Sequence, residues 1–167
     1  MARAFIGRAI DFLIGEYLPK IERCLEQLQD EQIWWRANPE SNSIGNLVLH
    51  LCGNARQWIV AGVGGQQDNR NRDAEFAQEE VIERAQLLST LRSTLSEVES
   101  VLNNLDPTTL LEPRRIQAYD VDVLEAIFHV TEHFSMHTGQ IILLTKILTR
   151  TDLGFYDFGS GTPEPRW

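Results

Sequence analysis

Hydrophobic residues recur every three or four positions in four stretches of the chain, which is the spacing of amphipathic helices. This pattern predicts helices at about residues 4–29, 44–61, 78–105 and 120–148. Pro19 falls inside the first stretch, where a proline is expected to kink or divide a helix. No stretch alternates apolar and polar residues in the manner of a strand, so we expect an all-α chain.

Polar residues between these stretches indicate where the helices begin and end. Asn42 and Ser43 are both able to cap the second helix, and Asp120 is expected to cap the fourth. The chain closes with a tail, residues 149–167, that is rich in glycine, proline and aromatic residues. Its Tyr156 and Phe158 could fold over the end of the helices as a lid, or simply pack there.

Four amphipathic helices of this length bury their apolar faces by packing together as a four-helix bundle. We expect a single domain over residues 1–167. The loop at 62–76 can span the length of the second helix, at about 3.3–3.6 Å per residue when extended. The break between the third and fourth helices can do the same, so loop length leaves the helix directions open.

The charge balance bears on which partners are expected. Fifteen Lys and Arg against 24 Asp and Glu give a net charge of −9, which repels phosphate backbones and argues against nucleic acid as a partner. No apolar run approaches the ~18–20 residues that cross a bilayer, so no membrane partner is expected. Cys24 and Cys52 are too few for a disulfide framework, and we interpret them as packing residues in a reducing cytoplasm.

All four histidines fall in the second and fourth predicted helices. On a wheel of about 100° per residue, His133 and His137 lie one turn apart within the apolar arc of the fourth helix. His129 lies at the edge of that arc. His50 lies on the flank of the apolar face of the second helix, so it can also face the interior.

Two imidazoles buried side by side repel each other when protonated, and each needs partners for two ring nitrogens when neutral. A divalent metal ion relieves this problem, because neutral imidazole is a good ligand and the ion satisfies one nitrogen on each ring. The same pattern also fits histidines held by ordinary hydrogen bonds. Periodicity alone does not decide between the two interpretations.

Two segments resemble the metal-binding helices of the DinB/YfiT-like superfamily of four-helix bundles. They are NSIGNLVLHLCGN at 42–54 and HVTEHFSMHTGQI at 129–141. Carried over position by position, the resemblance implies that His50, His133 and His137 ligate one divalent ion. His129 would then be a supporting or structural neighbour.

The resemblance also implies an up-down-down-up bundle, with 62–76 as a long crossover between helices two and three, and a homodimer. Helices one and three have wide apolar faces with room for that second contact. Many relatives carry Arg where this chain has Thr138, so no substrate contact is assigned at that position.

Three neutral ligands leave an ion with open positions and its full charge, which is typical of catalytic sites. All-imidazole ligation suits Zn or Ni, with Fe, Co or Mn as further options. The resemblance implies a metal-dependent enzyme of hydrolase or small-thiol S-transferase type, acting on a small-molecule substrate with a small thiol as one conceivable co-substrate. The alternative is a non-catalytic metal-binding, dimer-forming stress protein. A pocket beside the ion would favour the enzyme.

No motif supplies a nucleophile, so the catalytic residues and the substrate stay open. Asn46, Asn54 and Gln140 are candidates to orient the ligands or to contact substrate, although each could equally be a surface amide. Arg70 and Arg72 in the long loop could meet an anionic substrate or remain solvated.

Overall fold

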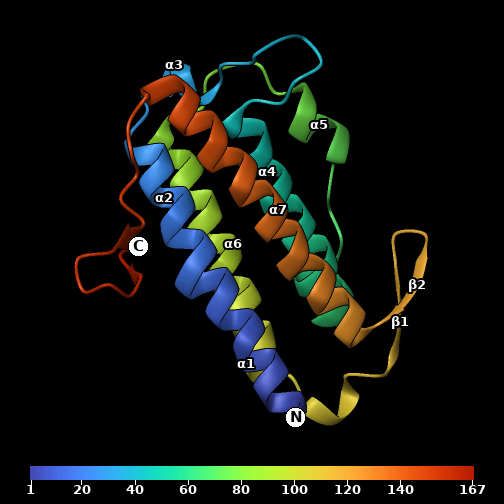
Figure 1. Cartoon of the computed structure of the whole chain (residues 1–167). Coiled ribbons are helices and arrows are strands. Elements are labelled where there is room, and N and C mark those ends of the chain that lie inside the picture. The colour runs from blue at the N-terminus through green and yellow to red at the C-terminus, as the bar shows by residue number, and fades with distance from the viewer.

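The computed structural model describes residues 1–167 and is mainly helical (Figure 1). Four long helical segments lie side by side: α1–η1–α2 (Ala2–Phe12, Leu13–Tyr17, Leu18–Glu26), α4–η2 (Ile44–Ala55, Arg56–Val63), α6 (Arg84–Asn104) and α7 (Val123–Thr149). The shorter helices are α3 (Asp30–Ile33), α5 (Arg72–Ala77) and η3 (Pro107–Thr109). The all-α prediction is therefore confirmed for most of the chain, and no helix is long and apolar enough to cross a membrane.

Two stretches of π-helix interrupt the regular helices. In the first long segment the π-helical turn Leu13–Tyr17 comes just before Pro19, and Pro19 occupies the first turn of α2. A proline is tolerated there because its missing N–H is not needed. The second long segment ends in the π-helical stretch η2, which carries Gln57 and Trp58. π-Helical turns often occur at functional sites, and both residues lie at the candidate site of this protein.

The third helix begins at Arg84 and not near residue 78, as its periodicity predicts. Val81 continues the apolar pattern but is 50% exposed. The preceding backbone is held by side chains instead: Trp34 donates its indole N–H to the carbonyl of Ile82 (3.0 Å), and Asn46 donates to that of Gln78 (3.0 Å). These carbonyls are therefore satisfied without a helix. We call the whole connection from η2 to α6, residues 64–83, the crossover.

The expectation of no strands is wrong in two short places. Strands β1 (Pro113–Ile116) and β2 (Tyr119–Asp122) pair antiparallel, and β3 (Tyr156–Asp157) pairs with β4 (Glu164–Pro165). The β1–β2 hairpin is anchored on η2 by Ile116, which is buried. A Cβ added at Gly62 would overlap the end of this isoleucine, so Gly62 gives the hairpin its room.

The hairpin also shifts the start of the last helix. Asp120, the expected cap, lies in β2 and pairs with Arg115 on the surface. Asp122 caps α7 instead: its side chain accepts from the backbone N–H of Glu125 (2.8 Å), and the Glu125 side chain accepts from the N–H of Asp122 (2.9 Å). At the second helix, Ser43 rather than Asn42 is the cap.

The core lies between the four long segments and includes both cysteines. Cys24 and Cys52 are buried and free, and burial raises their thiol pKa values to about 11 and 12. Such thiols stay protonated and unreactive near neutral pH. Their interpretation as packing residues is confirmed.

The C-terminal tail packs along the first long segment, on the opposite side of the molecule from the β1–β2 hairpin (Figure 1). Leu153 is buried, Arg23 donates to the carbonyl of Gly154 (3.0 Å), and Trp167 donates its indole N–H to the carbonyl of Gly15 (2.7 Å). Tyr156 and Phe158 remain 45% and 66% exposed. The tail therefore runs along the side of the first long segment, and neither option for Tyr156 and Phe158, a lid over the bundle end or packing there, is observed.

The α7 cap gives a test of the fold. Asp122→Ala should lower the free energy of unfolding by about 0.5–2 kcal/mol, because the backbone N–H of Glu125 loses its capping partner. The control is Asp120→Ala, which removes a neighbouring aspartate whose ion pair is exposed and should change stability little. Urea denaturation measures both variants. Equal losses would show that Asp122 does not cap α7.

Candidate metal centre

The structure brings the three predicted ligands together at one point between α4 and α7. His50 lies on α4, and His133 and His137 lie on α7. One ring nitrogen from each lies within 4.8 Å of the others, and Nε2 of His50 is 3.1 Å from Nε2 of His133. Two nitrogens that share an ion at about 2.0–2.1 Å are expected about 2.8–3.4 Å apart in octahedral or tetrahedral geometry. The Nε2 atoms of His50 and His133 are therefore already spaced for one ion, and a nitrogen of His137 lies within 4.8 Å of each.

Burial favours the neutral form, which binds metals, at His133 and His137. His50 and His133 are buried, and His137 is half-buried. Desolvation, followed by the neighbouring rings of His137 and His50, lowers the pKa of His133 to about 3. Desolvation also lowers the pKa of His137 and of His129. The ring of His133 is therefore neutral near pH 7, with one nitrogen lone pair available to an ion.

The three rings differ in how their outer nitrogens are held. Nδ1 of His50 lies 2.9 Å from the Glu75 carboxylate, and Nδ1 of His137 lies 2.6 Å from Oε1 of Gln140. Each of these oxygens accepts, so the proton sits on Nδ1 and the Nε2 lone pair faces the centre. Nδ1 of His133 is buried without a hydrogen-bond partner. His50 and His133 can share one hydrogen bond between their Nε2 atoms, which still leaves Nδ1 of His133 unpaired, and an ion between the rings fits this arrangement.

Glu75 and Arg70 are site residues whose roles the sequence pattern did not reveal. Arg70 donates from Nε to Oε1 of Glu75 (2.7 Å) and from Nη2 to Oε2 (2.9 Å). Their side chains are only 4% and 9% exposed, so Arg70 is not a solvated cation. It also lines the cleft beside the histidines, so its option as a substrate contact stays open. Burial alone would raise the pKa of Glu75, but hydrogen bonds from Arg70 and His50 bring it below its ordinary value.

The candidate amides occupy three different positions. Gln140 contacts His137 through the hydrogen bond to its Nδ1. Asn54 lies one turn after His50, with Nδ2 3.1 Å from Nε2 of His129. Asn46 contacts no ring: it completes the cap of α4 with Ser43 and donates to the carbonyl of Glu75 (2.9 Å).

His129 stands beside the centre and outside the group of three. Its ring packs against Trp58 with centroids 4.1 Å apart, and its Nε2 is engaged by Asn54. The expected supporting position for this histidine agrees with these contacts.

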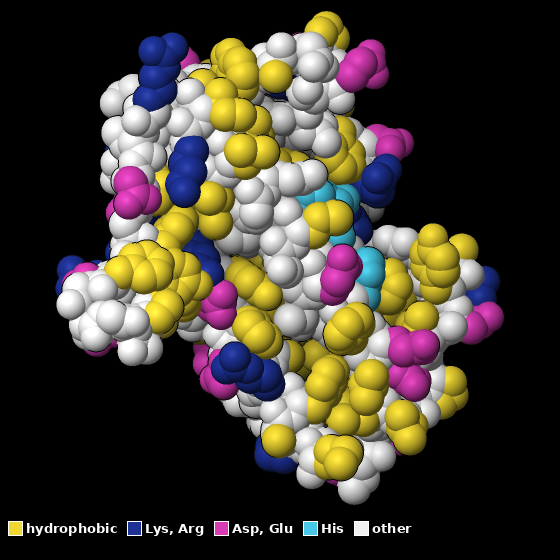
Figure 2. All heavy atoms as spheres, in the orientation of Figure 1, with side chains coloured by type: hydrophobic (Ala, Val, Ile, Leu, Met, Phe, Trp, Pro, Cys, Tyr) yellow, Lys and Arg dark blue, Asp and Glu magenta, His cyan; other side chains and the backbone are white.

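An open cleft of about 460 Å³ adjoins the histidines. Its walls come from α4, η2, the crossover, the β1–β2 hairpin and α7: His50, Asn54, Trp58, Arg70, Arg72, Gln117, Tyr119, Val121, Glu125, His129 and His133. Figure 2 shows histidine side chains reaching the surface beside basic and acidic groups. Gln117, in the left-handed region at φ 55°, donates to Gln57 and so ties the hairpin to η2 at the edge of this cleft.

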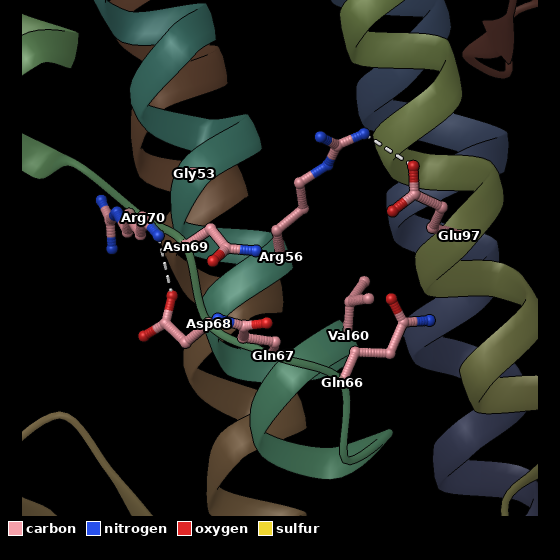
Figure 3. A pocket seen from close by; sticks show the side chains of 9 residues that line it. All are labelled: Gly53, Arg56, Val60, Gln66, Gln67, Asp68, Asn69, Arg70 and Glu97. Carbon is pink, nitrogen blue, oxygen red and sulfur yellow. Dashed lines mark hydrogen bonds and ion pairs between the residues drawn. The ribbon is translucent and has the colours of Figure 1, made fainter.

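A smaller hollow of about 230 Å³ lies on the other side of the crossover (Figure 3). Arg56 pairs there with Glu97 (2.6 Å), and Asp68 accepts from Gln57 (2.7 Å). Its remaining lining is mainly amide and backbone, and none of the three histidines reaches it. The cleft beside the histidines is therefore the candidate site.

Comparisons with known proteins agree with this description. A family model described as "Protein of unknown function (DUF1572)" matches residues 1–157. Among solved structures, a conserved protein from Enterococcus faecalis is similar at a TM-score of 0.71 and 15% identity, over 87% of this chain and 97% of that one. No curated protein matches the chain.

Two further solved structures are DinB-like proteins. One is YjoA from Bacillus subtilis, with a TM-score of 0.68, 15% identity and coverage of 90% of this chain and 97% of that one. The other is from Bacillus cereus, with a TM-score of 0.63, 15% identity and coverage of 79% and 85%. Identities this low show the fold alone. The chain belongs to the DUF1572 family, and its fold is similar to that of these two DinB-like proteins, in agreement with the resemblance of its two histidine segments.

Proposed function

We propose that this protein is a metal-dependent enzyme of hydrolase or small-thiol S-transferase type, with one divalent ion held by His50, His133 and His137. The observation that carries the proposal is the 3.1 Å approach of the Nε2 atoms of His50 and His133 at the wall of an open cleft. An ion on three neutral ligands keeps open positions and its full charge, so it can polarise a carbonyl or lower the pKa of a bound water or thiol. Zn or Ni suits the all-imidazole set best, with Fe, Co or Mn as alternatives.

The cleft supports an enzyme over a non-catalytic metal-binding stress protein. A storage or structural site has no need for a cavity of about 460 Å³ that opens on its ligands. The aromatic rings of Trp58 and Tyr119 and the cationic side chain of Arg72 give the cleft both apolar and polar walls. Such walls suit a small organic substrate.

We also infer that the four long segments form the up-down-down-up bundle of the DinB-like fold, as one domain. In Figure 1 the crossover leads from the end of η2 back to the start of α6, and α4 contacts both α6 and α7. The crossover runs over 64–83, later than the expected 62–76, because the second helix continues to Val63.

The apolar side chains exposed on α7 support the proposal of a homodimer. Phe128, Met136, Leu143 and Ile147 are 47–61% exposed along this helix, whereas α1 and α6 expose no large apolar side chain in their interiors. An apolar face of this kind favours contact with a second surface. We therefore assign the contact to α7 in place of helices one and three. The two free, buried cysteines support a reducing cytoplasm as its location.

The metal site is tested by titrating chelator-treated protein with Zn²⁺ or Ni²⁺ in a calorimeter. The wild type should bind one ion per chain. His133→Ala and His137→Ala should each abolish stoichiometric binding at micromolar protein, because two ligands remain. His129→Ala is the matched control, since it removes a neighbouring ring that contacts Asn54 and Trp58, and it should bind one ion.

The same proteins separate an enzyme from a binder. Metal-loaded wild type should turn over ester, amide or thiol–electrophile pairs in a screen, and His137→Ala should lose this activity while keeping its helical circular dichroism. A wild type that binds no ion, or a His129→Ala that loses it as fully as His137→Ala, would refute the three-histidine site.

Stability should depend on metal and pH together. An ion that binds only the folded chain stabilises it by about 2.7 kcal/mol at a free concentration 100 times its Kd, and the apo protein should stay folded on its apolar core. On acidification, protons compete with the ion for the ligand nitrogens and the gain falls. Because the pKa values of His133 and His137 are lowered, this loss should come below about 6.5, the ordinary imidazole pKa.

The apo protein should also lose stability as the pH falls through this range. His133 takes up its proton near pH 6.5 in the unfolded chain but only at about pH 3 in the folded one, so the unfolded state binds more protons between these values. Melting curves with and without chelator from pH 8 to pH 5 measure both effects. Identical curves throughout would mean that no ion is bound.

Assembly is tested by light scattering at micromolar concentration. We expect about twice the monomer mass, and Leu143→Glu should shift the protein to the monomer because it places a charge on the apolar face of α7. Val81→Glu alters an apolar side chain that is 50% exposed in the crossover and should leave the dimer intact. A monomeric wild type would contradict the proposal.

A further inference from the structure

Glu75 reaches the metal centre from the crossover, a part of the chain that supplies none of the three ligands. Its Oε2 lies 2.9 Å from Nδ1 of His50, and both side chains are 9% exposed. An ionised carboxylate only accepts, so the proton of the His50 ring must sit on Nδ1. The lone pair of Nε2 then points at His133, 3.1 Å away. Glu75 thus contacts Nδ1 of His50, whereas the proposed ion would bind Nε2 of the same ring.

Arg70 fixes the carboxylate in turn. Its Nε and Nη2 donate to the two oxygens of Glu75, at 2.7 and 2.9 Å, which is the fork geometry in which arginine holds carboxylates most firmly. Nη2 also lies 3.1 Å from Nδ1 of His50. Because both of these nitrogens are donors, the contact is not a hydrogen bond, and Glu75 accepts from each.

The backbone around Glu75 is fixed independently of its side chain. Asn46 donates to the carbonyl of Glu75 (2.9 Å), and Arg36 donates to that of Phe76 (2.9 Å). Asn71 caps α5 by accepting from the N–H of Ala74 (3.2 Å). These hydrogen bonds hold both ends of α5, the short helix that carries Glu75, and so place its carboxylate beside His50.

Gly53, three residues after His50 on α4, provides the space for this pair. A Cβ at this position would overlap Oε1 of Glu75 and lie 3.0 Å from Nε of Arg70. Any larger residue must push the carboxylate away. The HLCG segment therefore carries the proposed ligand His50 and, one turn later, Gly53, whose missing side chain leaves room for Glu75.

We propose that Glu75, held by Arg70 and accommodated by Gly53, is the positioning residue that fixes the tautomer and ring orientation of His50. His50 differs here from His133, whose Nδ1 has no partner, and from His137, whose partner Gln140 is exposed. His50 is thus oriented before any ion binds. This inference rests on the proposed metal centre, but its first test does not require the ion.

The first test is the two-bond ¹H–¹⁵N spectrum of apo protein carrying ¹⁵N-labelled histidine, with His50 assigned by comparison with His50→Ala. The wild type should show the Nδ1–H tautomer for His50. Glu75→Gln should convert it wholly or partly to Nε2–H, because an amide has one acceptor oxygen in place of two: when that oxygen faces Nε of Arg70, the NH₂ group faces Nδ1 of His50. Glu79→Gln removes the same charge from an exposed position in the crossover and should leave the spectrum unchanged.

The second test is Zn²⁺ affinity by calorimetry. Partners of ligand histidines contribute typically about 10–100-fold to metal affinity, so Glu75→Gln should weaken binding by that factor and Glu79→Gln should not. Gly53→Ala keeps every ionisable group but displaces the carboxylate, so it should reproduce both changes. It also serves as the second variant if Glu75→Gln does not fold.

The outcomes distinguish this inference from the proposed function. An Nε2–H tautomer in the wild-type apo protein overturns the role of Glu75, whatever the variants do. A wild-type affinity retained within twofold by Glu75→Gln and Gly53→Ala overturns it as well. A wild type that binds no Zn²⁺ but shows the Glu75-dependent tautomer refutes the metal centre and supports Glu75 as the residue that positions His50.

Discussion

The approach of His50 to His133 across the interface of α4 and α7 is the contact around which the site is arranged. Two imidazoles whose Nε2 atoms lie 3.1 Å apart can share at most one hydrogen bond, and Nδ1 of His133 has no partner. A buried ring nitrogen without a hydrogen-bond partner is costly, so a bundle core retains such rings only where packing holds them in place or where a ligand binds the nitrogen. The spacing of the two rings, the lowered pKa of His133 and the cleft beside them all favour a ligand.

That contact depends on helix register, and the caps set the register. Ser43 begins α4 and Asp122 begins α7 with reciprocal capping boxes. Each start determines which residues face the interface one or more turns later. His50 lies two turns after its cap and His133 three turns after its own. A shift of one residue at either start would turn its histidine by about 100° away from the other helix.

The sequence was a good guide to residues whose position follows from periodicity. His133 and His137 lie in phase with the core of α7, and this phase alone predicts that they face inward. Periodicity fails where side chains take over the backbone hydrogen bonds, as at the carbonyls of Gln78 and Ile82, so α6 starts later than its pattern predicts. It also fails for the β1–β2 hairpin, whose four-residue strands are too short to show alternation.

Glu75 and Arg70 could not be found from the sequence for a different reason. They lie in a polar segment without repeat, and their meeting with His50 depends on how the crossover folds back over α4. The consequence is electrostatic. Because Arg70 neutralises Glu75, the carboxylate can orient His50 without adding net negative charge to the centre. An ion on these three histidines would keep its full positive charge facing the cleft, and a centre that binds in order to polarise a substrate needs that charge.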